Sequence, residues 1–142
     1  VRRIIEERFG RHADEANWII AGDLNDYVEI DGLPVVDDNG RLVPGALDPL
    51  IADGFCDNVV RRRAPEDRWT SYHGPEDQYA QLDFLLLSPA LAAANPDMVP
   101  EIIRMGQPHR AVRHQGVRFP RVGWDRPKAS DHCPVVCDIT VP

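Results

Sequence analysis

Three short polar motifs adjoin apolar runs in this chain of 142 residues. Asp23 and Asn25 follow the run "WIIA", Asp83 interrupts "QLDFLLLS", and Asp131 and His132 precede "CPVV". Carboxylates, an amide and an imidazole are groups that bind a hard cation, activate a water molecule or hold a phosphate oxygen. These motifs are therefore the first candidates for a chemical site.

The motif "GDLND" places Asp23 and Asn25 two residues apart at the end of an expected strand. In an extended chain, residues i and i+2 point to the same side, with their Cα atoms ~7 Å apart. The pair could then face one cation, one water or one phosphate. The same residues also favour an Asx-turn, and the motif taken by itself favours that turn. Asp26 is interpreted as a turn residue.

Asp83 places a charge inside the strongest apolar strand pattern of the chain. Burying a carboxylate without a partner is costly or forces the group to bind a proton. A histidine is the natural partner, because a carboxylate fixes the tautomer of an imidazole and raises its basicity. A salt bridge to a nearby arginine is the alternative.

Asp131 and His132 are adjacent, so their side chains diverge, and one could bind a metal while the other faces a substrate. The three motifs lie at or within three expected strands, and neighbouring strands would bring them together. No serine or cysteine nucleophile with its own base accompanies them. The combination fits metal-assisted attack of water on a phosphoryl centre.

Hydrophobic periodicity, glycines and prolines divide the chain into short elements. We expect a helix over 1–9 ended by Gly10, a buried strand over 18–22 and a surface hairpin within 29–45. A second helix should have Asp48 as its N-cap and Pro49 at its first position, and it should stop at Gly54. The rest of the chain should form strands over 69–74 and 80–88, a short helix after Pro89, a long loop over 95–129 and a last strand over 133–141. Strands mixed with amphipathic helices indicate an α/β fold of the layered α+β kind.

The charge of the chain is unevenly distributed, although its net value is -7. Residues 101–128 contain six arginines and one lysine against two acidic residues, a net charge of +5, which leaves -12 for the remainder. A basic segment beside an acidic site is compatible with a partner that bears phosphate. A solvated loop explains the same segment equally well.

The three cysteines predict no disulfide framework, because their number is odd. Cys133 and Cys137 would lie ~13 Å apart in a strand, too far for a bridge. No stretch is long enough to cross a membrane, and no signal peptide is visible. Localisation is therefore not indicated. Because Val1 begins the chain within a helical pattern, we expect a part of a longer protein.

The segments "GDLN", "QLDFLLLS" and "SDHCPV", in this order, resemble the second half of the endonuclease/exonuclease/phosphatase superfamily, which has the deoxyribonuclease-like fold. That family includes nucleases, abasic-site endonucleases, sphingomyelinases and inositol-polyphosphate phosphatases. The resemblance extends over nearly the whole chain, since "LIADGFCDNVVR" and "WTSYHG" match a family helix and strand. It implies that residues 1–142 are the C-terminal portion of one such domain, about half of a four-layer sandwich with a mixed sheet and helices on one face.

The resemblance also implies a role for each motif residue and a metal, usually Mg²⁺ or Mn²⁺. By this resemblance, Asp23 is a metal-site acid that orients or deprotonates the attacking water, and Asn25 contacts the scissile phosphate or metal-bound water. Asp83 is the partner of the final histidine. Asp131 is a second metal-site acid, and His132 holds a phosphate oxygen. His73, His109, His114 and Trp124 are weaker candidates, more typical of surface or loop positions.

The chain lacks the glutamate, second asparagine and second histidine that the first half of the family supplies. We therefore expect a phosphoesterase fragment that is inactive alone, with one sheet face open to a missing N-terminal half or to another chain. The substrate stays open among nucleic acid, a phospholipid headgroup and a soluble phosphate ester. A non-catalytic binding module that keeps the fold is the alternative from a different class.

Overall fold

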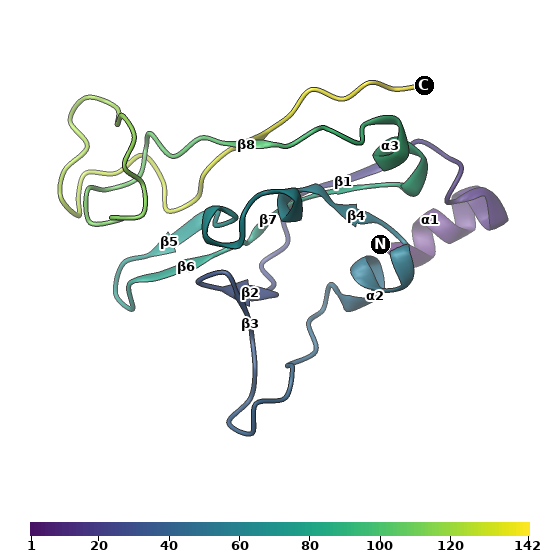
Figure 1. The fold of residues 1–142 in the computed structure, drawn as a ribbon, viewed down its shortest axis with the longest axis horizontal. Coiled ribbons are helices and arrows are strands. Elements are labelled where there is room, and N and C mark those ends of the chain that lie inside the picture. Colours follow the sequence, from purple (N-terminus) through teal and green to yellow (C-terminus); the bar gives the residue numbers. More distant parts are fainter.

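The computed structural model describes residues 1–142 and consists of short strands and a few helices (Figure 1). The α-helices are α1 (Arg2–Phe9), α2 (Asp48–Ile51) and α3 (Pro89–Ala94). The strands are β1 (Ile19–Asp23), β2 (Glu29–Ile30), β3 (Leu33–Pro34), β4 (Asp57–Asn58), β5 (Ser71–His73), β6 (Gln78–Ala80), β7 (Asp83–Leu87), β8 (Glu101–Ile102) and β9 (Val135–Val136). Four 3-10 turns cover Gly10–His12, Ala52–Gly54, Val59–Arg62 and Pro65–Asp67.

The strands form sheets with the orders β1-β7-β4, β3-β2-β6-β5 and β8-β9. Every strand pair is antiparallel. The expected α+β class is therefore confirmed, whereas the expectation of a mixed sheet is wrong. Tight turns join β2 to β3 and β5 to β6, and only antiparallel strands can be connected in this way.

The central strand β7 divides the apolar core, because successive side chains of a strand point to opposite faces. Phe84 and Leu86 face α1 and α2. On the other face, Leu87 packs against Leu91 of α3. Helices thus flank both faces, not one face as expected. The buried cluster beneath α1 and α2 consists of Ile5, Trp18, Leu47, Leu50, Cys56, Phe84 and Leu86.

Strand β1 is exposed over most of its length, although the sequence predicts a buried strand. Trp18 is buried just before it, but Ile19 is 45% exposed. β1 is an edge strand with β7 as its one neighbour. On the face that carries Ile19 and Ala21, α3 and the C-terminal segment cover Leu87 of β7 but leave both β1 side chains exposed. The β1 side of this face therefore stays in contact with solvent.

The predicted first helix is present, and so is the surface hairpin around Asn39 and Gly40, where Val36 and Leu42 form an isolated antiparallel bridge. α1 ends at Gly10, whose φ of 58° suits a residue without a side chain. Asp31 and Gly32 turn the chain between β2 and β3, and a Cβ at Gly32 would lie 2.8 Å from the Pro65 carbonyl oxygen. Residues 31–45 form an arm that projects from the body (Figure 1). α2 begins with Asp48 itself after an N-cap at Leu47, one residue earlier than predicted.

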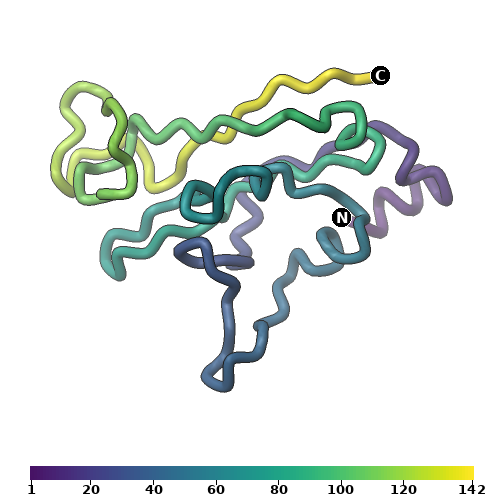
Figure 2. The backbone as a smooth tube through the Cα atoms, viewed as in Figure 1, coloured from purple at the N-terminus to yellow at the C-terminus, as the bar shows by residue number.

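Residues 95–129 form the predicted long loop, with β8 as their one short strand. The C-terminal segment runs back along the start of this loop (Figure 2). The amide of Asn95 joins the two, since it donates to the Thr140 carbonyl and accepts from the Thr140 N–H, both at 2.8 Å. The last strand is shorter than predicted, because only Val135 and Val136 pair with β8.

The cysteines are unpaired, as the sequence predicts, with Cys56 and Cys133 buried and Cys137 partly buried. None of the helices has the length and apolarity that crossing a membrane requires.

Candidate functional site

Two of the predicted site residues meet across the strands β1 and β7. Asp23 is the last residue of β1 and pairs in register with Asp83, the first residue of β7. Residues in register on antiparallel strands project from the same face of the sheet. Asp83 therefore lies at the start of its strand, not inside it as the sequence suggests, and its carboxylate faces the same side as that of Asp23.

His132 joins the two carboxylates. Its Nδ1 lies 2.9 Å from Asp83 Oδ2, and its Nε2 lies 4.0 Å from Asp23 Oδ2. Because a carboxylate can only accept, Nδ1–H donates to Asp83, and Nε2 is turned toward Asp23. The sequence left a histidine or an arginine as the partner of Asp83, and the partner is the histidine.

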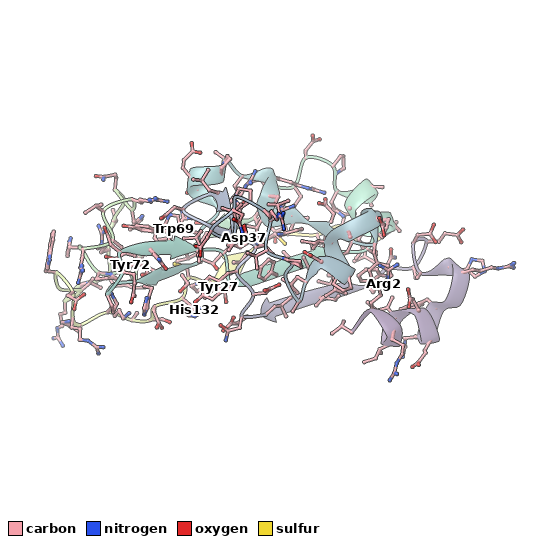
Figure 3. The ribbon with its side chains drawn as sticks, turned by 90° about the horizontal axis from the view of Figure 1, so that it is seen from below. Arg2, Tyr27, Asp37, Trp69, Tyr72 and His132 are labelled. Carbon is pink, nitrogen blue, oxygen red and sulfur yellow. The ribbon has the colours of Figure 1, made fainter.

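The strand β5 holds the segment that carries His132. Ser71 and His132 form an isolated antiparallel bridge. The Tyr72 N–H donates to the Asp131 carbonyl at 3.0 Å, and the Cys133 N–H donates to the Thr70 carbonyl at 2.7 Å. Figure 3 labels Tyr72 and His132 on this part of the molecule. The predicted "SDH" motif thus becomes an added edge segment beside β5.

Thr70 connects the two halves of the site, and sequence reasoning missed it. Its Oγ1 accepts the N–H of Leu82 at 3.0 Å and that of Asp83 at 2.9 Å. Its carbonyl accepts the Cys133 N–H, directly after His132. Thr70 is fully buried. A threonine in "WTSY" is an ordinary strand residue by type, so the sequence carries no signal for this contact.

Gln107 supports the other side of the histidine segment and was also missed. Its side chain is 1% exposed, and its Nε2 donates to the carbonyls of Ser130 and His132, each at 3.3 Å. The Ser130 Oγ accepts the His132 N–H at 3.0 Å. Gln107 lies in the long loop, where weak periodicity gives no reason to expect a buried amide. The backbone of His132 is held from both sides.

Asp23 is in the Asx-turn and in the cluster at the same time. Its Oδ1 accepts the Asn25 N–H at 3.0 Å, and Asn25 has a left-handed φ of 53°. Its Oδ2 accepts no hydrogen bond from the protein and faces His132. The two alternatives that the sequence left open are therefore both realised, one by each oxygen. The Asn25 side chain is exposed and lies outside the cluster.

Asp131 lies outside the cluster, and Asp26 makes a contact that the sequence did not predict. The Asp131 side chain is exposed and does not belong to the group formed by Asp23, Asp83 and His132. Asp26 is more than a turn residue, because its Oδ2 accepts the Leu47 N–H at 2.8 Å and anchors the segment before α2.

The weaker candidates lie outside the cluster. His73 is exposed and pairs with Glu76. His109 is exposed. His114 Nε2 lies 3.2 Å from the Val117 carbonyl, and burial lowers the pKa of His114. Trp124 is 67% exposed, so it does not anchor its loop through a buried ring.

A groove of about 360 Å³ adjoins the cluster. Asp83, Ser130 and His132 line its polar part, and Ala21, Leu85 and Val135 line its apolar part. The groove therefore runs from the site along β1 and β7, beside the segment that carries Val135.

Asp23, Asp83 and His132 each offer one ligand atom, and these atoms lie within 4.8 Å of one another. Mg²⁺ is usually held by one or two carboxylates, with waters and substrate phosphates completing its shell. Asp23 fits that role through its free Oδ2. Asp83 is less suited, because Oδ2 is used by the imidazole. The chain thus provides one well-placed carboxylate for a hard cation.

Comparison with family models, curated proteins and solved structures gives no match for this chain.

Proposed function

We propose that this chain is the C-terminal part of a divalent-metal-dependent phosphoric ester hydrolase of the endonuclease/exonuclease/phosphatase type. One observation carries the proposal: Asp83 and His132 form a hydrogen-bonded pair whose free Nε2 is 4.0 Å from Asp23 Oδ2. The three residues come from the three motifs whose order resembles that superfamily.

His132 and Asp83 act as a unit in the proposed reaction. The Asp83 carboxylate holds the tautomer with a proton on Nδ1 and fixes the orientation of the ring. Nε2 is then the nitrogen that meets the substrate. A protonated Nε2 donates a hydrogen bond to a phosphoryl oxygen, where negative charge develops as water attacks phosphorus.

Asp23 handles the attacking water. Its Oδ1 is fixed by the Asn25 N–H, and its Oδ2 orients the attacking water, which loses its proton to solvent as its oxygen bonds to phosphorus. The bond from phosphorus to the alcohol oxygen then breaks, and that oxygen takes up a proton from solvent. The exposed amide of Asn25 is close in sequence and could contact the phosphate, as the resemblance implies.

Mg²⁺ or Mn²⁺ would withdraw charge from the phosphoryl oxygens when bound. Asp23 would hold it through Oδ2, and Asp131, adjacent to His132 in the chain, is the second metal-site acid that the resemblance implies. A further polypeptide segment would supply the remaining ligand and cover the uncovered face at Ile19 and Ala21. A second sheet packed there would complete the sandwich that the resemblance implies, and without it we expect no hydrolysis.

The metal site is tested on the 142-residue chain by the paramagnetic broadening of its backbone amide NMR signals with Mn²⁺. We expect broadening of the signals of residues 22–25 and 131–132 at millimolar Mn²⁺, and its loss in Asp23→Asn. Asp53→Asn is the matched control, because Asp53 is an exposed acid on the turn after α2. Equal broadening in Asp23→Asn and wild type would refute the assignment of the metal.

Hydrolysis is tested on a protein that contains this chain together with the segment covering its open face. Plasmid DNA, RNA, sphingomyelin and bis-p-nitrophenyl phosphate are the substrates, with Mg²⁺ or with a chelator. We expect turnover that the chelator abolishes and that His132→Ala lowers by about 10²–10⁴-fold. Turnover unchanged by either treatment contradicts the mechanism, and turnover at a full enzymatic rate by residues 1–142 alone contradicts the need for a covering segment.

A non-catalytic binding module is the second candidate. It is favoured by the exposed positions of Asn25 and Asp131, which leave the cluster with three members. Metal and phosphate binding without hydrolysis of any substrate by the covered protein would support this candidate over the first.

A further inference from the structure

A second charged pocket lies beside the turn that follows β5, outside the cluster of Asp23, Asp83 and His132. Its volume is about 150 Å³. Its walls are Gly74, Pro75, Arg110, Asp125, Arg126 and Lys128. Three cations and one carboxylate therefore surround a space large enough for a small anion.

The cations of this pocket differ from the other cations of the basic segment 101–128. Three arginines of that segment are already used by the fold: Arg104 pairs with Asp67, Arg113 pairs with Asp31, and Arg118 donates to backbone carbonyls. Arg110 forms one long ion pair, with Asp125 at 3.8 Å, and Arg121, Arg126 and Lys128 form none. Arg110, Arg126 and Lys128 line the pocket.

The positive charge in the pocket is poorly compensated. Arg126 and Lys128 form no ion pair and donate no side-chain hydrogen bond. The nearest carboxylate to Arg110 is that of Asp125, and the two groups are 3.8 Å apart, beyond hydrogen-bond distance. Three cations against one carboxylate leave the pocket with excess positive charge. A concave surface with an excess of one sign of charge concentrates the opposite ion.

Backbone hydrogen bonds fix the loop that presents these cations. The Arg110 N–H donates to the Trp124 carbonyl at 2.7 Å, the His109 N–H donates to the Gly123 carbonyl at 3.0 Å, and the Gly123 N–H donates to the Pro127 carbonyl at 2.9 Å. The cationic side chains thus start from a crosslinked backbone, which lowers the entropy cost of gathering them around one ligand.

The pocket and the candidate site are connected through β5. Ser71 pairs with His132, and Gly74 follows three residues later, ~10 Å along an extended strand. Lys128 precedes His132 by four residues, so their Cα atoms are at most ~14 Å apart. A ligand in the pocket is therefore within reach of a molecule whose other end occupies the cluster.

We propose that this pocket binds a phosphate group, and that this group is a second phosphate of the substrate whose ester is cleaved at His132. The second clause rests on the proposed function, whereas phosphate binding does not. Arginine and lysine are the residues that proteins use for phosphate, through charge-assisted hydrogen bonds. A small negative group is the one ligand class that the charge and size of the pocket both fit.

Phosphate binding is tested on the 142-residue chain by amide NMR titration with inorganic phosphate and with pyrophosphate, in the presence of a chelator. We expect saturable shifts at Gly74, Arg110 and Lys128, and an affinity about ten-fold lower in Arg126→Gln with Lys128→Gln. Asp125→Asn should bind more tightly, because it removes the carboxylate from the pocket. The matched control is Arg41→Gln with Arg121→Gln, which removes two exposed charges outside the pocket.

Equal weakening in the pocket variant and in the control would overturn the site, because net charge alone would then explain binding. Shifts spread over the arginines outside the pocket would overturn it as well. His132→Ala should leave the titration unchanged, and this separates the pocket from the catalytic proposal. If the covered wild-type protein hydrolyses nothing, the proposed function fails, and the titration still decides phosphate binding.

The role in substrate binding is tested on the covered protein with a short oligonucleotide, a soluble polyphosphate ester and bis-p-nitrophenyl phosphate. Arg126→Gln with Lys128→Gln should raise KM about ten-fold for a substrate with several phosphates and leave it unchanged for the single phosphodiester. The multiply phosphorylated substrate that responds identifies the source of the phosphate. An unchanged KM for both would overturn the assignment to the substrate.

Discussion

Asp23 and Asp83 stand directly opposite each other on the antiparallel strands β1 and β7, and the imidazole of His132 adjoins both carboxylates. Like charges at opposed positions of a sheet are destabilising. The arrangement therefore costs stability, and His132 offsets part of that cost. These two opposed aspartates, with a histidine from a third chain segment beside them, distinguish the site from an ordinary strand end.

Asp23→Asn should raise the free energy of unfolding by about 0.2–1 kcal/mol, because it removes one of two opposed negative charges. The amide oxygen of asparagine can still accept the Asn25 N–H, so the turn survives. Urea unfolding at pH 7 measures the difference, with Asp53→Asn as the control. A destabilised Asp23→Asn protein would show that the carboxylate has a structural partner we have not recognised.

Asp83→Asn should change the tautomer of His132. In the wild type the carboxylate accepts from Nδ1–H, so the neutral ring carries its proton on Nδ1. An asparagine can accept or donate at this position, and both tautomers become accessible. Long-range ¹H–¹⁵N NMR spectra of the imidazole distinguish the two forms. A wild-type ring with its proton on Nε2 contradicts the pair that carries the proposed function.

Thr70→Val and Thr70→Ser distinguish the contribution of the Thr70 hydroxyl to stability from that of its methyl group. Valine leaves the buried N–H groups of Leu82 and Asp83 without an acceptor, at a cost of about 2–4 kcal/mol. Serine keeps the acceptor and should cost about 1 kcal/mol for the lost methyl group. Urea unfolding gives both values. Equal losses in the two variants would mean that packing, not hydrogen bonding, explains the burial of Thr70.

Asp67→Asn should make the free energy of unfolding less dependent on pH. Burial alone raises the pKa of Asp67, but hydrogen bonds and charge from Arg63 and Arg104 outweigh it, so the folded-state pKa is lowered. The carboxylate thus stabilises the fold above its ordinary pKa near pH 4, and this stabilisation disappears as pH falls through the lowered value. Arg104 is 8% exposed, so loss of its carboxylate partner is costly.

Since Asp67 is 40% exposed, solvent screening moderates the effect to about 2–4 kcal/mol at pH 7. The difference in the free energy of unfolding between the wild type and Asp67→Asn should shrink as the pH of the experiment is lowered from about 5 to about 3, the range in which carboxyl groups titrate. A constant difference over that range refutes the ion pair as its cause.

The native cysteines should resist alkylation at mildly alkaline pH. Burial raises the pKa of the Cys133 thiol to about 12 and that of Cys56 to about 11, and it also raises the pKa of Cys137. Since the thiolate is the reactive form, iodoacetamide should modify the partly buried Cys137 first and Cys133 last. Mass spectrometry of native and urea-unfolded protein measures the order. Rapid modification of native Cys133 would contradict its burial.

Local patterns in the sequence predict several elements well. The apolar spacing of residues 1–9 with Gly10 predicts α1, Pro89 with a run of alanines predicts α3, and Asp31 with Gly32 predicts the turn of the first hairpin. These features depend on backbone preferences of neighbouring residues, which the sequence states directly.

Contacts between distant residues could not be predicted in the same way. The sequence suggests a buried β1, yet burial depends on what covers a strand, and Ile19 at the sheet edge stays 45% exposed. It suggests a metal acid at Asp131, yet the bridge to β5 fixes the backbone there and leaves that side chain in solvent. Thr70 and Gln107 were missed because their hydrogen-bond partners lie far away along the chain.

The sequence by itself determined which residues could do chemistry and that Asp83 needed a partner, because a carboxylate in an apolar run is costly unless it is paired. The tertiary structure alone decided which partner it obtained. His132 is 49 residues away from Asp83 in the chain. The two meet because β5 lies between their segments and Thr70 bonds to both, and such a meeting depends on strand register and not on any local preference.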